Sequence, residues 1–486
     1  MRLRELAPET AGRMTADAEI ASLAYDSRRV QPGALFFCVS GFNVDGAGFA
    51  ADALAAGAAA LVVERELELD APQLVVPSVR NAMGVVADRF YEHPSRELEL
   101  IGVTGTNGKT TTTYLVRGLL EACGTQTGLL GTVQSIIAGR QREVERTTPE
   151  AIDLQADLRA MADGGDGACA MEVSSHALAL GRVAGARFSA AVFTNLTQDH
   201  LDFHTDMEDY FRAKRLLFEP PTPPAPGVCV VNRDDPYGER LAAELPGAVT
   251  FSLAAEADYR ADEVRSELTG ASFTLDVRGE RRKLRIPLPG RFNVQNALAA
   301  LAVCHERGRP LEQLLDALER PLRVPGRFEP VTDDEPFAVL VDYAHTPDSL
   351  ENVLAAARGL VEGGPGRVIS VFGAGGDRDR TKRPLMGAAS ARLADITIVT
   401  SDNPRSEDPE AIIAEILSGT GPDVTAITDR REAIIHAVGL AREGDVLIIA
   451  GKGHEQGQEF AAGRKVPFDD VVVAREALAA RRAQAA

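Results

Sequence analysis

The segment from Gly102 to Thr110 constrains the fold of this chain more than any other part of the sequence. An apolar run from Leu98 to Val103 leads into it, and a stretch with helical spacing of apolar residues follows over 115–123. This order predicts a strand, a glycine-rich turn and the start of a helix. Backbone N–H groups in such a turn point to one place, where the helix dipole adds positive potential.

The spacing of the glycines departs from the common phosphate-loop pattern. That pattern has a glycine five residues before the Gly-Lys-Thr glycine, and Val103 holds this position here. A plain strand-to-helix turn with a solvated lysine is the alternative interpretation. Lys109 and Thr110 directly follow the glycines between a strand and a helix, which favours a site for a nucleoside triphosphate and its magnesium ion.

Composition excludes several classes of protein. The chain has 486 residues and a net charge of -19, which argues against nucleic acid as a partner. No apolar run is long enough to span a membrane, and the N-terminus lacks the apolar core of a signal peptide. Five cysteines are scattered without paired spacing. These features predict a cytoplasmic protein with reduced cysteines and no zinc site.

Strand-like apolar runs alternate with helical stretches along most of the sequence, and the length is typical of about three domains. Breaks at His93-Pro94-Ser95 and at 322–327 divide it into segments 1–93, 94–324 and 325–486. We therefore predict an α/β chain with a small N-terminal α/β domain, a central phosphate-loop domain with a parallel sheet, and a C-terminal Rossmann-like domain. The strands are expected at 35–39, 61–63, 74–76, 98–103, 168–173, 190–194, 228–231, 339–341, 368–372, 396–400 and 446–450.

Polar residues follow several of these strands, at the sheet edge where ligands of α/β proteins bind. Glu172 and His200 are candidate magnesium ligands there, although both could merely cap helices. His345 precedes Thr346-Pro347, which predicts a helix start, and it could equally be a helix-end histidine without a ligand. Asp402 to Arg405 could be an Asn-Pro turn with a solvated arginine. Gly373 to Arg378 is a weak partial match to a dinucleotide-binding loop.

Taken together, the motifs resemble the Mur ligase family of peptidoglycan precursor synthesis, over nearly the whole chain. The resemblance is carried by segments spread along all three predicted domains: 26–28, 104–110, 147–149, 172–176, 194–202, 293–296, 325–327, 342–345, 375–378, 402–405 and 451–455. The altered phosphate loop is the form that this family uses. One position departs from the family, which often has Asp-Gly-His where this chain has Asp45-Gly46-Ala47.

The resemblance implies a reaction and its substrates. ATP would phosphorylate the free carboxylate of UDP-N-acetylmuramoyl-L-alanyl-D-glutamate, and the amine of an amino acid would attack the acyl phosphate. The first domain would hold the UDP end, the second ATP and the third the amino acid. The members that the C-terminal motifs resemble use meso-diaminopimelate, whose distal carboxylate suits an arginine. We expect a monomer with no membrane insertion.

The resemblance also implies roles for individual residues. The catalytic residues would be Lys109, Glu172, His200 and Lys214, and Mg²⁺ would be bound by Thr110, Glu172, His200 and a carbamylated Lys214. ATP would contact Gly105, Thr106, Asn107, Gly108, Lys109, Thr110, Thr111, Asn296, Arg327, Asp342 and His345. The nucleotide-linked dipeptide would contact Ser27, Thr147, Thr148, Ser174 and Arg182. Diaminopimelate would contact Arg378, Asp402, Asn403, Arg405, Gly451 and Glu455.

Three alternatives stay open. The first is another ligase of the same superfamily, such as a folylpolyglutamate synthetase, and the second is a nucleotide-switch or phosphate-loop motor protein. The third is an inactive binding module, which the presence of Lys109, Glu172, His200 and Lys214 disfavours.

Overall fold

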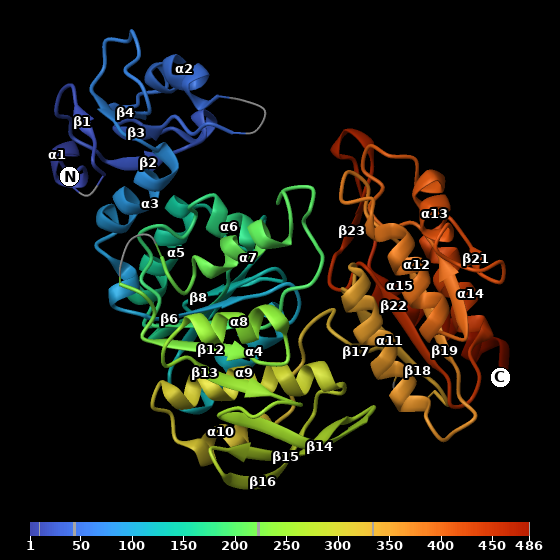
Figure 1. Cartoon of the computed structure of the whole chain (residues 1–486). Helices are drawn as coiled ribbons and strands as arrows, with labels where there is room; N and C mark the ends of the chain where they lie inside the picture. Colours follow the sequence, from blue (N-terminus) through green and yellow to red (C-terminus); the bar gives the residue numbers. More distant parts are fainter. Residues whose placement is uncertain (9, 42–44, 221–223, 333–334, 486) are drawn as a thin grey trace. The chain divides into compact units, whose positions relative to one another are not determined.

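The computed structural model describes residues 1–8, 10–41, 45–220, 224–332 and 335–485. The chain folds into two compact units. Figure 1 labels the helices and strands along the chain. The first unit comprises residues 1–104, 124–192 and 212–229, and the second comprises 105–123, 193–211 and 230–486. Among the described residues, no helix is both long and apolar enough to cross a membrane.

The first unit begins with a five-stranded sheet in the order β1-β5-β4-β3-β2. Only the short edge strand β1 runs antiparallel to its neighbour. The strands are β1 (Arg13–Met14), β2 (Ser22–Ala24), β3 (Ala34–Phe37), β4 (Ala60–Val63) and β5 (Gln73–Val75). Buried side chains of α2 (Ala50–Ala55) and α3 (Val79–Phe90) pack on this sheet in two separate apolar clusters. The helices therefore close both faces of the predicted N-terminal α/β domain.

A second group of strands in this unit surrounds β10 (Ala168–Glu172), which pairs in parallel with β6 (Glu99–Thr104) and β7 (Thr127–Leu130). Antiparallel strands β8 (Ser135–Ile137) and β9 (Arg140–Arg142) extend the sheet beyond β7. Helix α5 (Ala151–Asp163) contributes Ala151 and Ile152 to the same cluster as α3. The shorter elements are α1 (Leu3–Leu6), η1 (Ser27–Arg29), η2 (Gly46–Phe49), η3 (Pro94–Arg96) and α6 (Ser175–Ala179).

In the second unit, helix α4 (Lys109–Ala122) packs against α9 (Arg291–Glu306). Strand β12 (Val228–Asn232) pairs with β13 (Val249–Ser252), and the sheet continues through β14 (Tyr259–Glu267), β15 (Gly270–Val277) and β16 (Glu280–Ile286). In this extension, β15 pairs antiparallel with both β14 and β16. This antiparallel extension was not predicted from the sequence. Helices α8 (Pro236–Glu244) and α10 (Leu311–Leu318) also belong to this unit. The residues of β11 (Ala190–Phe193), α7 (Met207–Arg215) and β12 are divided between the two units.

The C-terminal part of this unit is a six-stranded sheet in the order β17-β18-β22-β19-β20-β21. All of its strands are parallel except the edge strand β17. The strands are β17 (Glu329–Pro330), β18 (Ala338–Asp342), β19 (Val368–Phe372), β20 (Ile396–Val399), β21 (Thr425–Ala426) and β22 (Val446–Ala450). Strands buried on both faces explain the continuous apolar runs of the sequence.

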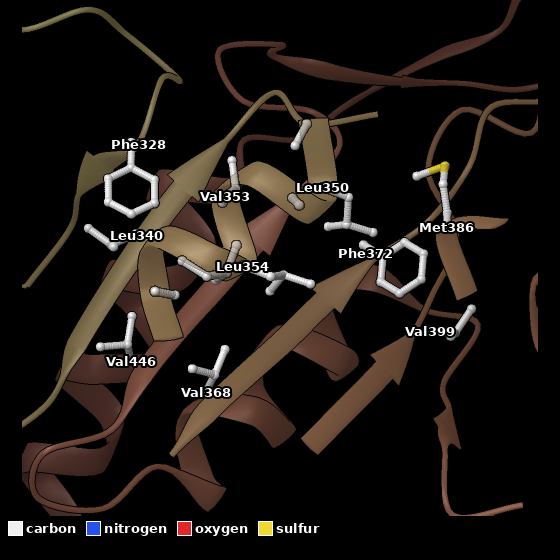
Figure 2. Close-up of a cluster of buried hydrophobic side chains, with 14 of the residues drawn as sticks. Phe328, Leu340, Leu350, Val353, Leu354, Val368, Phe372, Met386, Val399 and Val446 are labelled. Atoms are coloured by element: carbon white, nitrogen blue, oxygen red, sulfur yellow. The ribbon is translucent and has the colours of Figure 1, made fainter. Parts of the chain in front are cut away.

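Helices cover both faces of this sheet. Helices α11 (Pro347–Val361), α12 (Lys382–Leu393) and α13 (Pro409–Leu417) bury one face, and Figure 2 shows the side chains of α11 gathered against the strands. Helices α14 (Arg430–Leu440) and α15 (Asp470–Ala485) bury the other face. The small pair β23 (Gly457–Glu459) and β24 (Lys465–Pro467) and the turn η4 (Ala461–Gly463) follow β22. The predicted Rossmann-like domain is confirmed.

Two neighbouring arginines of α14 allow a test of this packing. Arg430 and Asp470 form an ion pair in which both side chains are fully buried, whereas Arg431 pairs with Glu476 at the surface. We expect Arg430→Met to lower the free energy of unfolding by about 3 kcal/mol or more, because Asp470 loses its buried partner. The matched change Arg431→Met should cost less than about 1 kcal/mol. Denaturant titrations would measure both, and equal losses would contradict this view of the core.

Candidate functional site

The phosphate loop has the predicted strand–turn–helix geometry. Strand β6 ends at Thr104 and α4 begins at Lys109, with Gly105 and Gly108 at φ angles of 148° and 87°. Gly108 is the N-cap of α4, and no side chain caps this helix end. The N–H groups of the first turn therefore face the position of an anion. The Lys109 ammonium donates to the carbonyls of Gly105 and Thr106, at 3.0 and 2.8 Å.

A second loop, after β11, holds the phosphate loop in place. The Asn107 amide donates to Asn195 Oδ1 at 2.9 Å, and Thr194 Oγ1 donates to the Asn107 carbonyl at 2.6 Å. Asn107 Nδ2 also donates to Asp348 Oδ2 of α11, at 2.6 Å. The structure thus brings the predicted loop 194–202 to the phosphate loop, as the shared sheet edge suggested.

Four of the predicted ATP contacts lie together around the first turn of α4. A Cβ atom on Gly108 would be 2.4 Å from Asn296 Oδ1, so only glycine fits between α4 and α9. Arg327 Nη2 donates to Thr110 Oγ1 at 2.8 Å, and its guanidinium lies 4.6 Å from the centre of the Tyr343 ring. These contacts hold the Arg327 guanidinium beside the N-terminus of α4. A helix N-terminus and a guanidinium both bind phosphate groups.

Asp342 ends strand β18 beneath this arginine. Its carboxylate accepts hydrogen bonds from the amides of Phe328 and Ala344, at 2.7 and 2.8 Å. Burial raises the pKa of Asp342 to about 6, although the nearby Arg327 charge and these two hydrogen bonds lower it. The carboxyl therefore fixes the turn that carries Arg327.

Asp199 is the centre of a charged cluster that the sequence interpretation did not single out. Its carboxylate lies 3.4 Å from His200 Nε2, 3.9 Å from His345 Nε2 and 3.7 Å from Lys382 Nζ. Burial alone would raise the pKa of Asp199, but these three groups lower it below its ordinary value. Burial, followed by the Lys382 charge, lowers the pKa of His345. The cluster joins two predicted site histidines to the first turn of α12.

In the first unit, Glu172 lies at the end of β10 with its side chain almost fully buried. Its carboxylate accepts hydrogen bonds from the amide and the hydroxyl of Thr132, at 2.8 and 3.0 Å. The Thr148 hydroxyl donates to the Glu172 carbonyl at 2.8 Å and lies 3.4 Å from Ser174 Oγ. The Thr132 hydroxyl lies 3.1 Å from that of Thr147. Three predicted dipeptide contacts therefore gather around Glu172.

The remaining predicted residues of this unit lie in different surroundings. Arg182 Nε lies 2.9 Å from Glu150 Oε1, and burial lowers the pKa of this arginine. Ser27 begins the turn η1, where Asp26 caps the helix. Lys214 on α7 is only 1% exposed. A lysine of a helix with charged residues in its first and last turns is ordinarily solvated, so the burial of Lys214 sets it apart from the other charged residues of α7.

The predicted amino-acid contacts cluster at the carboxyl ends of β20 and β22. Asn403 Nδ2 donates to Glu455 Oε2 at 2.8 Å, and a Cβ atom on Gly451 would lie 2.4 Å from Asp402 Oδ2. Arg405 donates to the Gly376 carbonyl and to Glu459 Oε2, at 2.7 and 3.1 Å.

The Gly373–Arg378 segment belongs to the same cluster. Its Gly375 lies beside the guanidinium of Arg405 and the side chain of Arg378, whose Nη1 donates to the Asp377 carbonyl at 2.9 Å. Helix α12 begins only at Lys382, so the immediate turn into a helix that a dinucleotide-binding loop needs is absent from this segment.

Sequence reasoning missed Lys382, Asp348 and Lys452 as parts of these clusters. Lys382 lies in a charged run and Asp348 in the first turn of a helix, so neither stands out by its position in the sequence. Lys452 lies within a segment that was singled out, between Gly451 and Glu455. Among the described residues, no three histidine, cysteine or carboxylate side chains form a metal-binding group.

The Asp199 cluster leads to a prediction about pH. Asp199→Asn should destabilise the chain by roughly 2 kcal/mol at pH 7, because Lys382 loses a buried counter-charge. The pKa of Asp199 is lower in the folded chain than its ordinary value of 3.8, so this stabilisation is complete above about pH 5 and is lost as the pH falls. Thermal unfolding at pH 7, 5 and 4 would show it. The exposed Asp202→Asn is the matched control, and a pH-independent difference would contradict the assignment.

Three family models match successive segments of the chain. The family model described as "Mur ligase family, catalytic domain" matches residues 19–91. The "Mur ligase middle domain" model matches 103–304, and the "Mur ligase, glutamate ligase domain" model matches 326–453. The matches thus extend over most of the chain.

Curated relatives and solved structures are similar over almost the full length. The UDP-N-acetylmuramoyl-L-alanyl-D-glutamate–2,6-diaminopimelate ligases of Syntrophomonas wolfei and Gloeobacter violaceus are 46% and 48% identical to this chain. The alignments cover 95% of this chain and 95% of the first ligase, and 100% and 99% for the second. A solved structure of a ligase with the same name is 36% identical, with a TM-score of 0.68 and coverage of 95% of both chains.

A more distant structure shares the fold. The MurF ligase from Thermotoga maritima, solved in complex with ADP, is 18% identical, with a TM-score of 0.66 and coverage of 96% of this chain and 98% of its own. The high identity of the nearer relatives, the three matching family models and the shared fold lead to one conclusion: the chain belongs to the Mur ligase family.

Proposed function

We propose that this chain is an ATP-dependent ligase that joins meso-2,6-diaminopimelate to UDP-N-acetylmuramoyl-L-alanyl-D-glutamate in peptidoglycan precursor synthesis. Relatives with this printed activity are 46–48% identical over nearly the whole chain, which supports the proposal. The structural observation that carries it is the cluster of Asp402, Asn403, Arg405 and Glu455 at one sheet edge. Such a cluster offers both signs of charge to an amino acid that has an ammonium and a carboxylate at its distal end.

The reaction would proceed in two steps. The free carboxylate of the dipeptide attacks the γ-phosphorus of ATP, so that ADP leaves and an acyl phosphate forms. The amine of the amino acid then attacks the acyl carbon, and the tetrahedral intermediate releases phosphate and leaves an amide. Lys109 and the N–H groups of the first turn of α4 would hold the phosphates, with Arg327 adding charge beside Thr110.

Mg²⁺ fits the residue types that the family resemblance assigns to it. The ligands would be the Thr110 hydroxyl, the Glu172 carboxylate, His200 and Lys214 as a carbamate. Mg²⁺ takes one or two protein oxygens together with phosphate oxygens and water, so it needs no preformed group of three carboxylates. The ion would supply positive charge that offsets the repulsion between the ATP phosphates and the dipeptide carboxylate. Lys214 is only 1% exposed, and this burial supports a role within the site.

The residues around Glu172 would position the other substrate. Thr147, Thr148 and Ser174 present hydroxyl groups next to one another, and Arg182 adds a guanidinium in the same unit. Ser27 would contact the UDP end, in a first domain where Ala47 replaces the histidine that the family often has. We further propose the segments 1–93, 94–324 and 325–486 as the UDP, ATP and amino-acid domains of a cytoplasmic monomer.

A substrate panel tests the choice of amino acid. Phosphate release from ATP and the nucleotide-linked dipeptide should be at least about 100-fold more efficient with meso-diaminopimelate than with lysine or ornithine, because lysine and ornithine lack the distal carboxylate that Arg405 would bind. Steady-state kcat/KM for each amino acid would measure the preference. Faster turnover with lysine, ornithine or glutamate would refute the assignment, and glutamate would favour a folylpolyglutamate-type ligase. ATP turnover that needs no amino acid would favour a nucleotide switch or motor.

The phosphate-loop lysine tests the source of energy. Lys109→Ala should lower kcat for ADP formation by about 100-fold or more, because a cation is lost where negative charge moves between phosphates and carboxylate. The exposed Lys283→Ala on β16 is the matched control and should leave kcat unchanged. Unchanged kcat in the Lys109 variant would contradict this role of the lysine, and a wild-type chain that forms no ADP with any of the amino acids would support the inactive-module interpretation.

A further inference from the structure

Lys452 is a fully buried cation within the predicted amino-acid site. Its ammonium donates to Asn403 Oδ1 and to Glu455 Oε2, both at 2.9 Å, and lies 3.8 Å from Asp402 Oδ1. Its side chain has no exposed surface, whereas that of Glu455 is 31% exposed. The ammonium of Lys452, a residue of the loop after β22, therefore links this loop to the loop after β20.

The surrounding hydrogen bonds fix these loops in register. Asn403 Oδ1 also accepts from the Glu459 amide at 3.0 Å, and Gln458 Nε2 donates to the Asp402 carbonyl at 2.9 Å. Arg430 donates to the Ala450 carbonyl at 2.9 Å, one residue before Gly451. The partners of Lys452 are therefore fixed by other hydrogen bonds, and the position of its ammonium is fixed with them.

Lys452 lowers the net negative charge of the cluster. Asp402 and Glu455 carry two negative charges, and Lys452 compensates one of them. The neighbouring arginines have carboxylates of their own, since Arg430 pairs with Asp470 and Arg405 with Glu459. Without the Lys452 ammonium, the carboxylates of Asp402 and Glu455 would both be uncompensated and would attract any cation. With Lys452 in place, a single net negative charge faces an incoming ammonium.

We propose that Lys452 is a positioning residue that sets the amino-acid selectivity, an inference that rests on the proposed ligase function. The distal end of diaminopimelate carries an ammonium and a carboxylate and has no net charge, whereas the distal end of lysine is a lone cation. Lys452 repels the lone cation and holds Glu455 and Asn403 for the ammonium of the neutral pair. Selectivity thus comes from rejection of lysine as well as from the carboxylate contact of Arg405.

Two variants separate the effect of Lys452 on selectivity from its effect on affinity. Lys452→Met adds net negative charge, and we expect KM for diaminopimelate to rise and the ratio of kcat/KM for diaminopimelate over lysine to fall by about tenfold or more. Glu455→Gln removes negative charge, so both amino acids should bind more weakly while that ratio is kept or rises. KM for ATP should stay unchanged in both variants. The exposed Lys465→Met on β24 is the matched control, with all constants unchanged.

The measurements separate a selectivity role from a purely structural one. If Lys452→Met lowers Tm and all kinetic constants together while the amino-acid ratio stays at the wild-type value, the inference is wrong. If Lys452→Met does not fold, a Glu455→Gln variant that prefers lysine more than the wild type would equally overturn it. A wild-type enzyme with no preference for diaminopimelate would refute the proposed function itself, and the inference with it.

Discussion

A chain with a net charge of -19 that binds nucleotides must concentrate positive charge where phosphates lie. The structure meets this constraint with the open first turn of α4 and with a few cations held by neighbouring groups. Arg327 is held by Thr110 and by stacking on Tyr343, and Lys382 is held by Asp199. Because each cation has a defined partner, its charge is held at a fixed position near the start of α4 or of α12.

The same partners join loops that are far apart in the sequence. Asn107 of the phosphate loop contacts Asp348 of α11, and Asp199 contacts both His345 and Lys382. Under the proposed function, residues for ATP and for the amino acid therefore lie within one compact unit. The residues assigned to the dipeptide lie in the other unit, where Glu172 organises three hydroxyl-bearing side chains.

Local patterns in the sequence predicted what depends on near neighbours. The phosphate-loop turn, the Thr346 cap of α11 and the buried parallel strands are confirmed, since each follows from spacing or residue type within a short segment. The antiparallel strands β14 to β16 were missed, although Phe273, Leu275 and Val277 alternate with more exposed residues in a way typical of a half-buried strand.

Contacts that join distant segments could not be read from the sequence. The partnership of Asp199 with Lys382 spans 183 residues, and the burial of Lys214 and Lys452 depends on tertiary packing. The family resemblance predicted site residues along the chain, but it did not indicate which charges compensate one another. That information needs the three-dimensional arrangement.

The central claim is that ATP activates the dipeptide carboxylate before the amine attacks. Its most direct test uses a dipeptide substrate whose free carboxylate carries heavy oxygen, with the isotope followed into the released phosphate by mass spectrometry. Transfer of one labelled oxygen to phosphate, dependent on meso-diaminopimelate and equal to amide formed, is the predicted result. Release of unlabelled phosphate alongside amide formation would contradict the account.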